Sequence, residues 1–213
     1  MARYDISVAY GAETPPWPGD TPYTCGWAWD MGDGATVNVG RVSTSWHVGT
    51  HDDAPRHVSL AGKTSELLPL DAFHGAVTVL DATDAVAGRT ITTEWLSRAL
   101  EGRRLPDRLL LRTGRSVATG VFPDAWPALT AEAAAWLTRS GLRLLGVDAP
   151  SVDPRTATEL KVHHALFGGG AFILENLHLA HVPAGDWVLT AYPVLVTGAD
   201  AAPVRALLES PRR

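Results

Sequence analysis

From about residue 76 onward, short apolar runs alternate with amphipathic segments, and this alternation constrains the fold more than any other feature of the sequence. Thr130 is suited to cap one helix, whereas Asp153 and Pro154 suit the N-cap and first position of the next. Strands are predicted at residues 76–80, 109–112, 142–147, 171–174 and 187–196, and helices at residues 93–101, 130–141 and 153–168. Alternating strands and helices predict an α/β fold, with a mixed β-sheet flanked by helices. The chain has 213 residues, so we expect one compact domain over residues 1–213.

The first forty residues have a different character, and we expect residues 1–40 to form an extended, turn-rich arm. Three prolines surround Trp17, and Gly19-Asp20 indicates a turn. Asp33-Gly34 is a hairpin signal between strand-like residues 27–29 and 36–39, and a further strand is expected over residues 41–46. Cys25 is the one cysteine, which excludes an internal disulfide and a cysteine-based zinc site. We expect its thiol to be buried or half-buried.

Composition and charge exclude several classes of protein. With 46% hydrophobic and 19% charged residues, the chain can bury a sizeable core and is not expected to be disordered. No run approaches the roughly 18 to 20 apolar residues of a membrane span. A net charge of −5 and the lack of a Lys/Arg run disfavour nucleic acid and anionic membranes as partners. The N-terminal residues lack the pattern of a signal peptide, and we therefore expect a cytoplasmic location.

Four ionisable side chains recur at spacings of four, two and four residues: His47, His51, Asp53 and His57. In an extended backbone the odd-numbered positions face the same side, so these groups would converge there. A helix is disfavoured because Gly49 is a poor helix former and Pro55 pushes the preceding residue out of the α region. Asp52 would point to the opposite side, and we expect it to face solvent.

Neutral imidazoles and a carboxylate on one face predict a site for a divalent ion such as Zn²⁺. One segment cannot surround an ion, so further ligands must come from elsewhere. His163 and Glu175 are candidates, and Asp53 has two oxygens with which it could bridge two ions. Glu159 lies one helical turn before His163 and could support it. Taken alone, a histidine such as His163 is more often a solvated or hydrogen-bonded helix residue than a ligand.

The string His-x-Gly-Thr-His-x-Asp-x-Pro-x-His over residues 47–57 resembles the signature of the cyclase-like metal hydrolases. Further strings resemble the bacterial kynurenine formamidase branch of that family: residues 17–22, 37–39, 146–154, 173–177 and 185–187. The resemblance covers nearly the whole chain, from Tyr4 to a last helix expected around residues 204–207. It implies a compact α/β domain around a mixed sheet, in homodimers whose N-terminal arms help to build the partner's site.

The resemblance also implies two Zn²⁺ ions per subunit, with Mn²⁺ or another divalent ion as alternatives. Three residues would hold the first ion: His47, His51 and Asp53. Three would hold the second: Asp53, His163 and Glu175. His57 would donate and accept the proton in catalysis, and Trp17 would contact an aromatic substrate. The alternative for Trp17 is a structural role, in which the indole packs on the neighbouring prolines.

The implied activity is that of a zinc-dependent amidohydrolase, an arylformamidase acting on a small aromatic formamide. It would hydrolyse N-formyl-L-kynurenine to L-kynurenine and formate in tryptophan degradation. A second interpretation keeps the metal site but assigns isatin or another cyclic amide as substrate. A third is a metal-stabilised binding protein that has lost catalysis, which the presence of His57 and both ligand sets disfavours.

Overall fold

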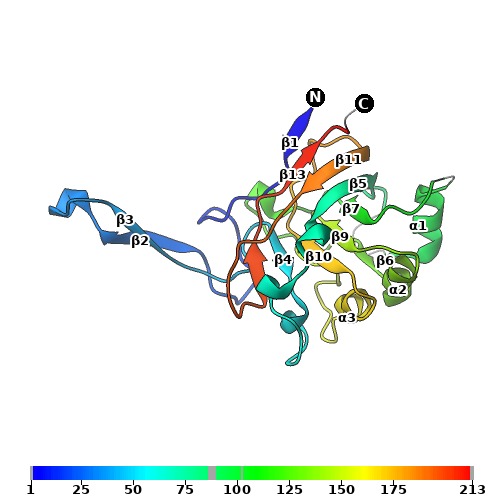
Figure 1. The fold of residues 1–213 in the computed structure, drawn as a ribbon, viewed down its shortest axis with the longest axis horizontal. Helices are drawn as coiled ribbons and strands as arrows, with labels where there is room; N and C mark the ends of the chain where they lie inside the picture. The colour runs from blue at the N-terminus through cyan, green and yellow to red at the C-terminus, as the bar shows by residue number, and fades with distance from the viewer. Residues whose placement is uncertain (1, 86–89, 102, 212–213) are drawn as a thin grey trace.

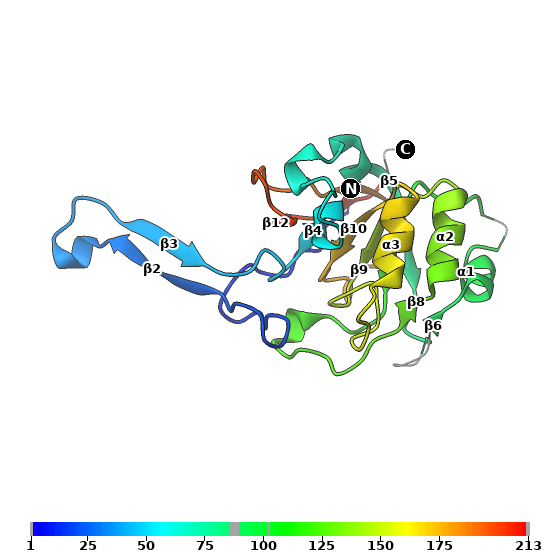
Figure 2. The same cartoon turned by 90° about the horizontal axis from the view of Figure 1, so that it is seen from below.

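The computed structural model of the protein describes residues 2–85, 90–101 and 103–211. Within these ranges, a nine-stranded sheet forms the centre of the molecule, and α-helices cover one of its faces (Figures 1 and 2). In the order of hydrogen-bonded neighbours its strands are β1 (Arg3–Asp5), β13 (Leu207–Glu209), β11 (Gly185–Thr190), β5 (His74–Asp81), β7 (Arg108–Arg112), β9 (Leu144–Val147), β10 (Phe172–Glu175), β4 (His51–Asp53) and β12 (Ala201–Pro203). Strands β5, β7, β9 and β10 pair in parallel, and the outer pairs are antiparallel. The predicted α/β fold with a mixed sheet is therefore confirmed.

The described residues contain three α-helices: α1 (Thr93–Ala99), α2 (Ala131–Arg139) and α3 (Lys161–Gly168). Thr130 caps α2 as predicted, because its hydroxyl accepts the Ala133 N–H at 3.1 Å. None of the described helices has the length and apolar character needed to cross a membrane. The remaining strands form two small pairs: β6 (Thr90–Ile91) with β8 (Ala128–Leu129), and β2 (Thr24–Trp29) with β3 (Val39–Ser43).

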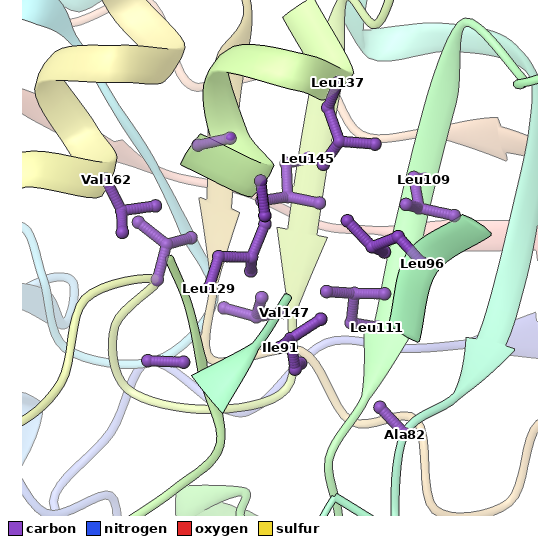
Figure 3. Packing of buried hydrophobic residues seen from close by; sticks show 14 of the residues in the cluster. Ala82, Ile91, Leu96, Leu109, Leu111, Leu129, Leu137, Leu145, Val147 and Val162 are labelled. Carbon is purple, nitrogen blue, oxygen red and sulfur yellow. The ribbon is translucent and has the colours of Figure 1, made fainter. Parts of the chain in front are cut away.

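The central strands are apolar on both faces because both faces of the sheet are covered. Leu109 and Leu111 point toward the helices, where they pack with Leu96 of α1 and Leu137 of α2 (Figure 3). Leu110, between them, packs in a second buried cluster on the opposite face. This alternation along one strand explains why its sequence reads as an unbroken run of leucines.

Two predicted helices differ from the structure. Helix α3 begins at Lys161 rather than at residue 153, because the intervening residues form turns and Leu160 adopts the left-handed region with φ 45°. Asp153 still caps this helix from a distance, since its carboxylate accepts the N–H groups of Val162 and His163 at 3.0 Å each. The last helix predicted around residues 204–207 is also wrong, because β13 begins at Leu207 and pairs with β1 and β11.

Strands β2 and β3 form a hairpin that projects well away from the body of the molecule (Figures 1 and 2). Its tip lies near the predicted Asp33-Gly34 turn, where Gly34 adopts φ 90°. The predicted arm over residues 1–40 thus divides in two, because β1 joins the main sheet and the hairpin extends to residue 43. Cys25 lies on this hairpin and is exposed, so the prediction of a buried or half-buried thiol is wrong.

Candidate metal centre

Strand β4 carries the centre of the histidine-rich motif and lies between β10 and β12 in the sheet. Its register places Glu175 directly opposite His51, so that these two side chains share a face. Asp53 is two residues further along the strand and points to the same side. All three side chains are buried, with exposed fractions of 1% for His51, 1% for Asp53 and 4% for Glu175. Pairing of β4 with β10 therefore brings two segments that are distant in sequence into one buried polar cluster.

Three imidazoles lie close to the carboxylate oxygens of Asp53. His47 Nδ1 lies 3.0 Å from Asp53 Oδ1, and His51 Nε2 lies 3.5 Å from the same oxygen. His163 Nε2 lies 3.1 Å from Asp53 Oδ2 and 3.5 Å from Glu175 Oε1. The structure thus brings together all five residues that were predicted as ligands, with His47 and His51 near one oxygen of Asp53 and His163 near the other.

His47 and His57 converge on this cluster for a different reason from the one predicted. The motif is not extended throughout: His47 precedes a bend at Gly49, which has φ 70°, and His57 ends the 3-10 helix Pro55–His57. A Cβ on Gly49 would lie 2.8 Å from the carbonyl oxygen of Ala9, so only glycine fits this bend. The ring centroids of His47 and His57 lie 4.4 Å apart. The prediction of a single extended face is therefore wrong, although the predicted convergence is found.

The hydrogen bonds behind three histidines orient each ring toward the cluster. His51 Nδ1 donates to the carbonyl oxygen of Gly49 at 2.9 Å, which leaves Nε2 facing Asp53 and Glu175. His163 Nδ1 is 2.6 Å from Asp153 Oδ2, and His47 Nε2 is 3.1 Å from Asp200 Oδ2. Oxygen acceptors behind the rings are the usual way to present the other imidazole nitrogen to a metal.

The charge balance of the cluster also fits a cation. Burial lowers the pKa of His163, but hydrogen bonds to Asp153 and Asp53 outweigh burial and raise the pKa to about 10. Burial raises the pKa of Glu175 to about 8, and the charge of Asp53 adds to this effect. Asp53 Oδ1 is buried and has no hydrogen bond of good geometry to the described residues, although His47 Nδ1 lies 3.0 Å away. Two buried carboxylates surrounded by imidazole nitrogens match the N/O donor set that divalent transition metals accept.

Asp52 does not face solvent, and the prediction that it would is wrong. Asp52 is fully buried, because β4 is an interior strand of the sheet and both faces of this strand are covered. The Ser65 hydroxyl donates to Asp52 Oδ2 at 3.0 Å, and the Ala202 N–H donates to Oδ1 at 2.9 Å. Burial, only partly offset by these donors, raises the pKa of Asp52 to about 7.

The supporting role expected of Glu159 belongs to another carboxylate. Glu159 is exposed and pairs with Lys161 at 2.9 Å, whereas Asp153 holds the ring of His163. Asp200 was not predicted at all, although it contacts both His47 and His57. The sequence around Asp200 gives no local signal for this role, since the contact depends on pairing of β12 with β4.

A cavity of about 280 Å³ opens beside the cluster and is lined by His57, His163 and Glu175. Trp17 forms part of the cavity wall and packs edge-on against Phe122 and Trp126, with ring centroids 5.4 Å and 5.9 Å away. The predicted turn holds Trp17 in place, because the Asp20 N–H donates to the Trp17 carbonyl at 2.9 Å and Gly19 adopts φ 93°. A polar buried cluster therefore meets an aromatic wall within one cavity.

These features define a candidate divalent-metal centre next to a substrate-sized cavity. The Cyclase family model, whose description reads "Putative cyclase", matches residues 4–154. Kynurenine formamidase of Bacillus cereus is 41% identical over 204 residues, covering 96% of this chain and 95% of the relative. Kynurenine formamidase of Bordetella avium is 38% identical over 205 residues and covers 96% of both chains. The chain belongs to the Cyclase family, and the resemblance to its kynurenine formamidase branch is confirmed by these relatives.

Solved structures show the same fold. A "predicted metal-dependent hydrolase" from Bacillus stearothermophilus is 27% identical, has a TM-score of 0.81 and covers 97% of both chains. Isatin hydrolase A from Labrenzia aggregata is 24% identical, has a TM-score of 0.84, and covers 98% of this chain and 93% of its own. The second likeness concerns the fold alone.

Proposed function

We propose that this protein is a metal-dependent amidohydrolase that converts N-formyl-L-kynurenine to L-kynurenine and formate, a step in tryptophan degradation. The observation that carries the proposal is the buried cluster around Asp53, which meets an aromatic wall at Trp17 within one cavity. The relatives named kynurenine formamidase, about 40% identical over 96% of the chain, support the choice of substrate.

The proposal assigns two ions, Zn²⁺ in preference to Mn²⁺, to each subunit. The first ion would be held by His47, His51 and Asp53. The second would be held by Asp53, His163 and Glu175. Short distances from both Asp53 oxygens to the imidazoles support this division. A divalent ion bound here supplies Lewis acidity, which activates water at neutral pH and polarises a carbonyl group.

His57 is proposed as the general acid and base of the reaction. It lines the cavity, and its ring centroid lies 4.4 Å from that of His47 and 5.7 Å from that of His163. The scissile bond ends on an arylamine nitrogen, which leaves only after it has gained a proton. His57 would take a proton from water and return it to that nitrogen, a contribution worth roughly 10² to 10⁴ in rate.

Trp17 is proposed to contact the aromatic ring of the substrate. Its edge-on packing against Phe122 and Trp126 holds the indole at the cavity wall and favours this role over packing on the neighbouring prolines. A cyclic amide such as isatin is the weaker alternative substrate, since a likeness to isatin hydrolase concerns the fold alone.

We further propose a homodimer in which the β2–β3 hairpin contributes to the interface and to the partner's site. The support is a row of exposed apolar side chains on the hairpin: Trp27, Trp29, Met31, Val37, Val39 and Val42. Exposed apolar surface of this kind on a two-stranded ribbon indicates a protein interface. The cytoplasm is the proposed location, in keeping with the exposed thiol of Cys25.

The test is release of kynurenine from N-formyl-L-kynurenine by chelator-treated protein, before and after reloading with Zn²⁺ or Mn²⁺. We expect release to require the metal, and His57→Ala to keep the metal while losing at least about 100-fold in kcat. His74→Ala is the matched control, because His74 is an exposed residue that bonds Thr190 outside the cluster. Absence of release from reloaded protein would refute the substrate, and loss of metal from His57→Ala would make His57 a ligand instead. Isatin, tested in parallel, separates the two substrates.

A further inference from the structure

We propose that Asp200 is a positioning residue that holds His47 and His57 in fixed orientations, so that the metal centre and the acid–base group share one carboxylate. The part concerning His57 rests on the function proposed above. The part concerning His47 depends only on the metal centre and can be tested separately.

Pairing of the edge strand β12 with β4 places Asp200 next to the motif. Strand β12 pairs antiparallel with β4, and Ala201 lies opposite Asp53. Just before this pair, the Ala54 N–H donates to the Asp200 carbonyl oxygen at 2.9 Å. The main chain of Asp200 is therefore bound to the motif itself, between the ligand Asp53 and the 3-10 helix that ends at His57. Its side chain is held beside the cluster by backbone hydrogen bonds.

One oxygen of Asp200 contacts both imidazoles. Asp200 Oδ2 lies 3.1 Å from His47 Nε2 and 3.4 Å from His57 Nδ1. A carboxylate oxygen has two lone pairs and can accept both N–H groups. Among the described residues, the ion pairs of the Asp200 side chain are those with these two histidines.

These contacts select the tautomer of each ring. Because a carboxylate only accepts hydrogen bonds, Asp200 favours a proton on Nε2 of His47, so that in the neutral ring Nδ1 is the nitrogen left to bind a metal beside Asp53, whose Oδ1 is 3.0 Å away. In the same way His57 carries a proton on Nδ1, and its Nε2 is the atom that remains for proton transfer. Asp200 thus determines which nitrogen of His47 meets a metal and which nitrogen of His57 meets the substrate.

The position of Asp200 separates its role from substrate binding. Asp200 is absent from the lining of the cavity that holds Trp17 and His57. Removing its carboxylate should therefore change kcat and metal affinity and leave KM near its original value. Substituting a residue that only stabilised the loop would change neither the metal affinity of the folded protein nor the kcat of the metal-loaded protein.

The experiment compares Asp200→Ala and Asp200→Asn with the control Glu66→Gln. Glu66 anchors the same loop, since its carboxylate accepts the Gly198 N–H at 3.1 Å, but it contacts neither histidine. Zn²⁺ affinity is measured by competition with a chromogenic chelator, and steady-state kinetics are measured at Zn²⁺ concentrations that saturate each variant. Thermal unfolding identifies the variants that are folded.

For Asp200→Ala we expect Zn²⁺ affinity to fall about 10- to 100-fold, the usual effect of removing an acceptor behind a ligating histidine. At saturating Zn²⁺ we expect kcat to fall at least about tenfold while KM stays within about twofold, in line with general acid–base contributions of 10² to 10⁴. Asp200→Asn keeps an oxygen acceptor without its charge and should lie between Asp200→Ala and the parent. Glu66→Gln should match the parent in both measurements. In a His57→Ala background, Asp200→Ala should cost no further kcat, because the two residues act as one unit.

Several results would overturn the proposal. If Asp200→Ala binds Zn²⁺ with the affinity of the parent protein, Asp200 does not orient His47 for metal binding. Parental kcat at saturating Zn²⁺, or a rise in KM alone, would contradict the hold on His57, as would additive losses in the double variant. If Asp200→Ala fails to fold, Asp200→Asn gives the same comparison with an acceptor in place. If the loaded parent protein releases no kynurenine, the proposed function fails, and the affinity comparison still decides the contact with His47.

Discussion

Asp52 provides a direct test of how strongly β4 is buried, because it is a carboxylate in the interior of the sheet. Its pKa rises from an ordinary value of 3.8 to about 7, chiefly through burial. Asp52→Asn removes the charge and keeps the geometry. An Asn oxygen can still accept the Ala202 N–H, and the amide nitrogen can donate to the Ser65 hydroxyl. The substitution should therefore stabilise the protein where Asp52 would be ionised.

The expected magnitude follows from the two pKa values. One pKa unit corresponds to 1.36 kcal/mol, so ionising Asp52 in the folded protein costs about 4 kcal/mol. Below pH about 4 the carboxyl is protonated in the folded and unfolded states, and the cost is absent. Between pH about 4 and about 7 the unfolded state ionises first, so the free energy of unfolding decreases as pH rises. Above pH about 7 the full cost is present and no longer changes.

The assay is urea unfolding of chelator-treated protein, followed by tryptophan fluorescence, for the parent and Asp52→Asn at a series of pH values. The advantage of Asp52→Asn in free energy of unfolding should grow by about 2 to 3 kcal/mol between pH 5 and pH 8. Asp33→Asn is the control, because Asp33 is exposed at the tip of the hairpin and is solvated in both states. A difference between parent and Asp52→Asn that is constant across this range, or that shrinks with rising pH, would refute the argument.

Three further predictions concern the metal, the substrate and the assembly. Asp53→Ala should lower bound Zn²⁺ from the proposed two ions per subunit to less than one by elemental analysis, because His47 lies beside one Asp53 oxygen and His163 beside the other; two retained ions would refute the bridge. Trp17→Ala should raise KM about tenfold with little change in kcat, a loss of about 1.4 kcal/mol in binding; unchanged kinetics would assign Trp17 a structural role. Trp27→Ser with Trp29→Ser, at side chains 54% and 62% exposed, should convert the proposed dimer to monomer in sedimentation experiments without lowering stability; an unaltered dimer would exclude the hairpin from the interface.

The central strands could be predicted from the sequence because each is a nearly continuous apolar run. Leu109, Leu110 and Leu111 are all buried, since the sheet is covered on both faces, and the run is visible in the sequence itself. The start of α3 was not predictable in the same way. Asp153 and Pro154 look like a helix start, but Leu160 adopts a left-handed conformation, and Asp153 uses its carboxylate on a helix that begins eight residues later. Tertiary contacts decide that boundary.

Within the candidate site, Asp52 and Asp53 also show that a local sequence pattern does not reveal tertiary contacts. Their opposite orientations follow from strand geometry, and the sequence predicts them correctly. Whether the face that carries Asp52 meets solvent depends on the neighbours of β4, which are β10 and β12 from the C-terminal part of the chain. Period-two alternation indicates which residues share a face, and only the complete sheet shows that both faces are buried.

The candidate ligands and the groups that orient them come from different parts of the sequence. The motif at residues 47–57 supplies His47 and His51, and the bend at Gly49 is part of the same string. The acceptors behind two of the rings, Asp153 and Asp200, lie more than 90 residues further along the chain and depend on the α3 cap and on β12. A chain could retain the complete motif and lose these acceptors, and its histidines would then be free to present the wrong nitrogen. Among chains with the motif, Asp153 and Asp200 are therefore the positions we expect to separate a working metal centre from a remnant of one.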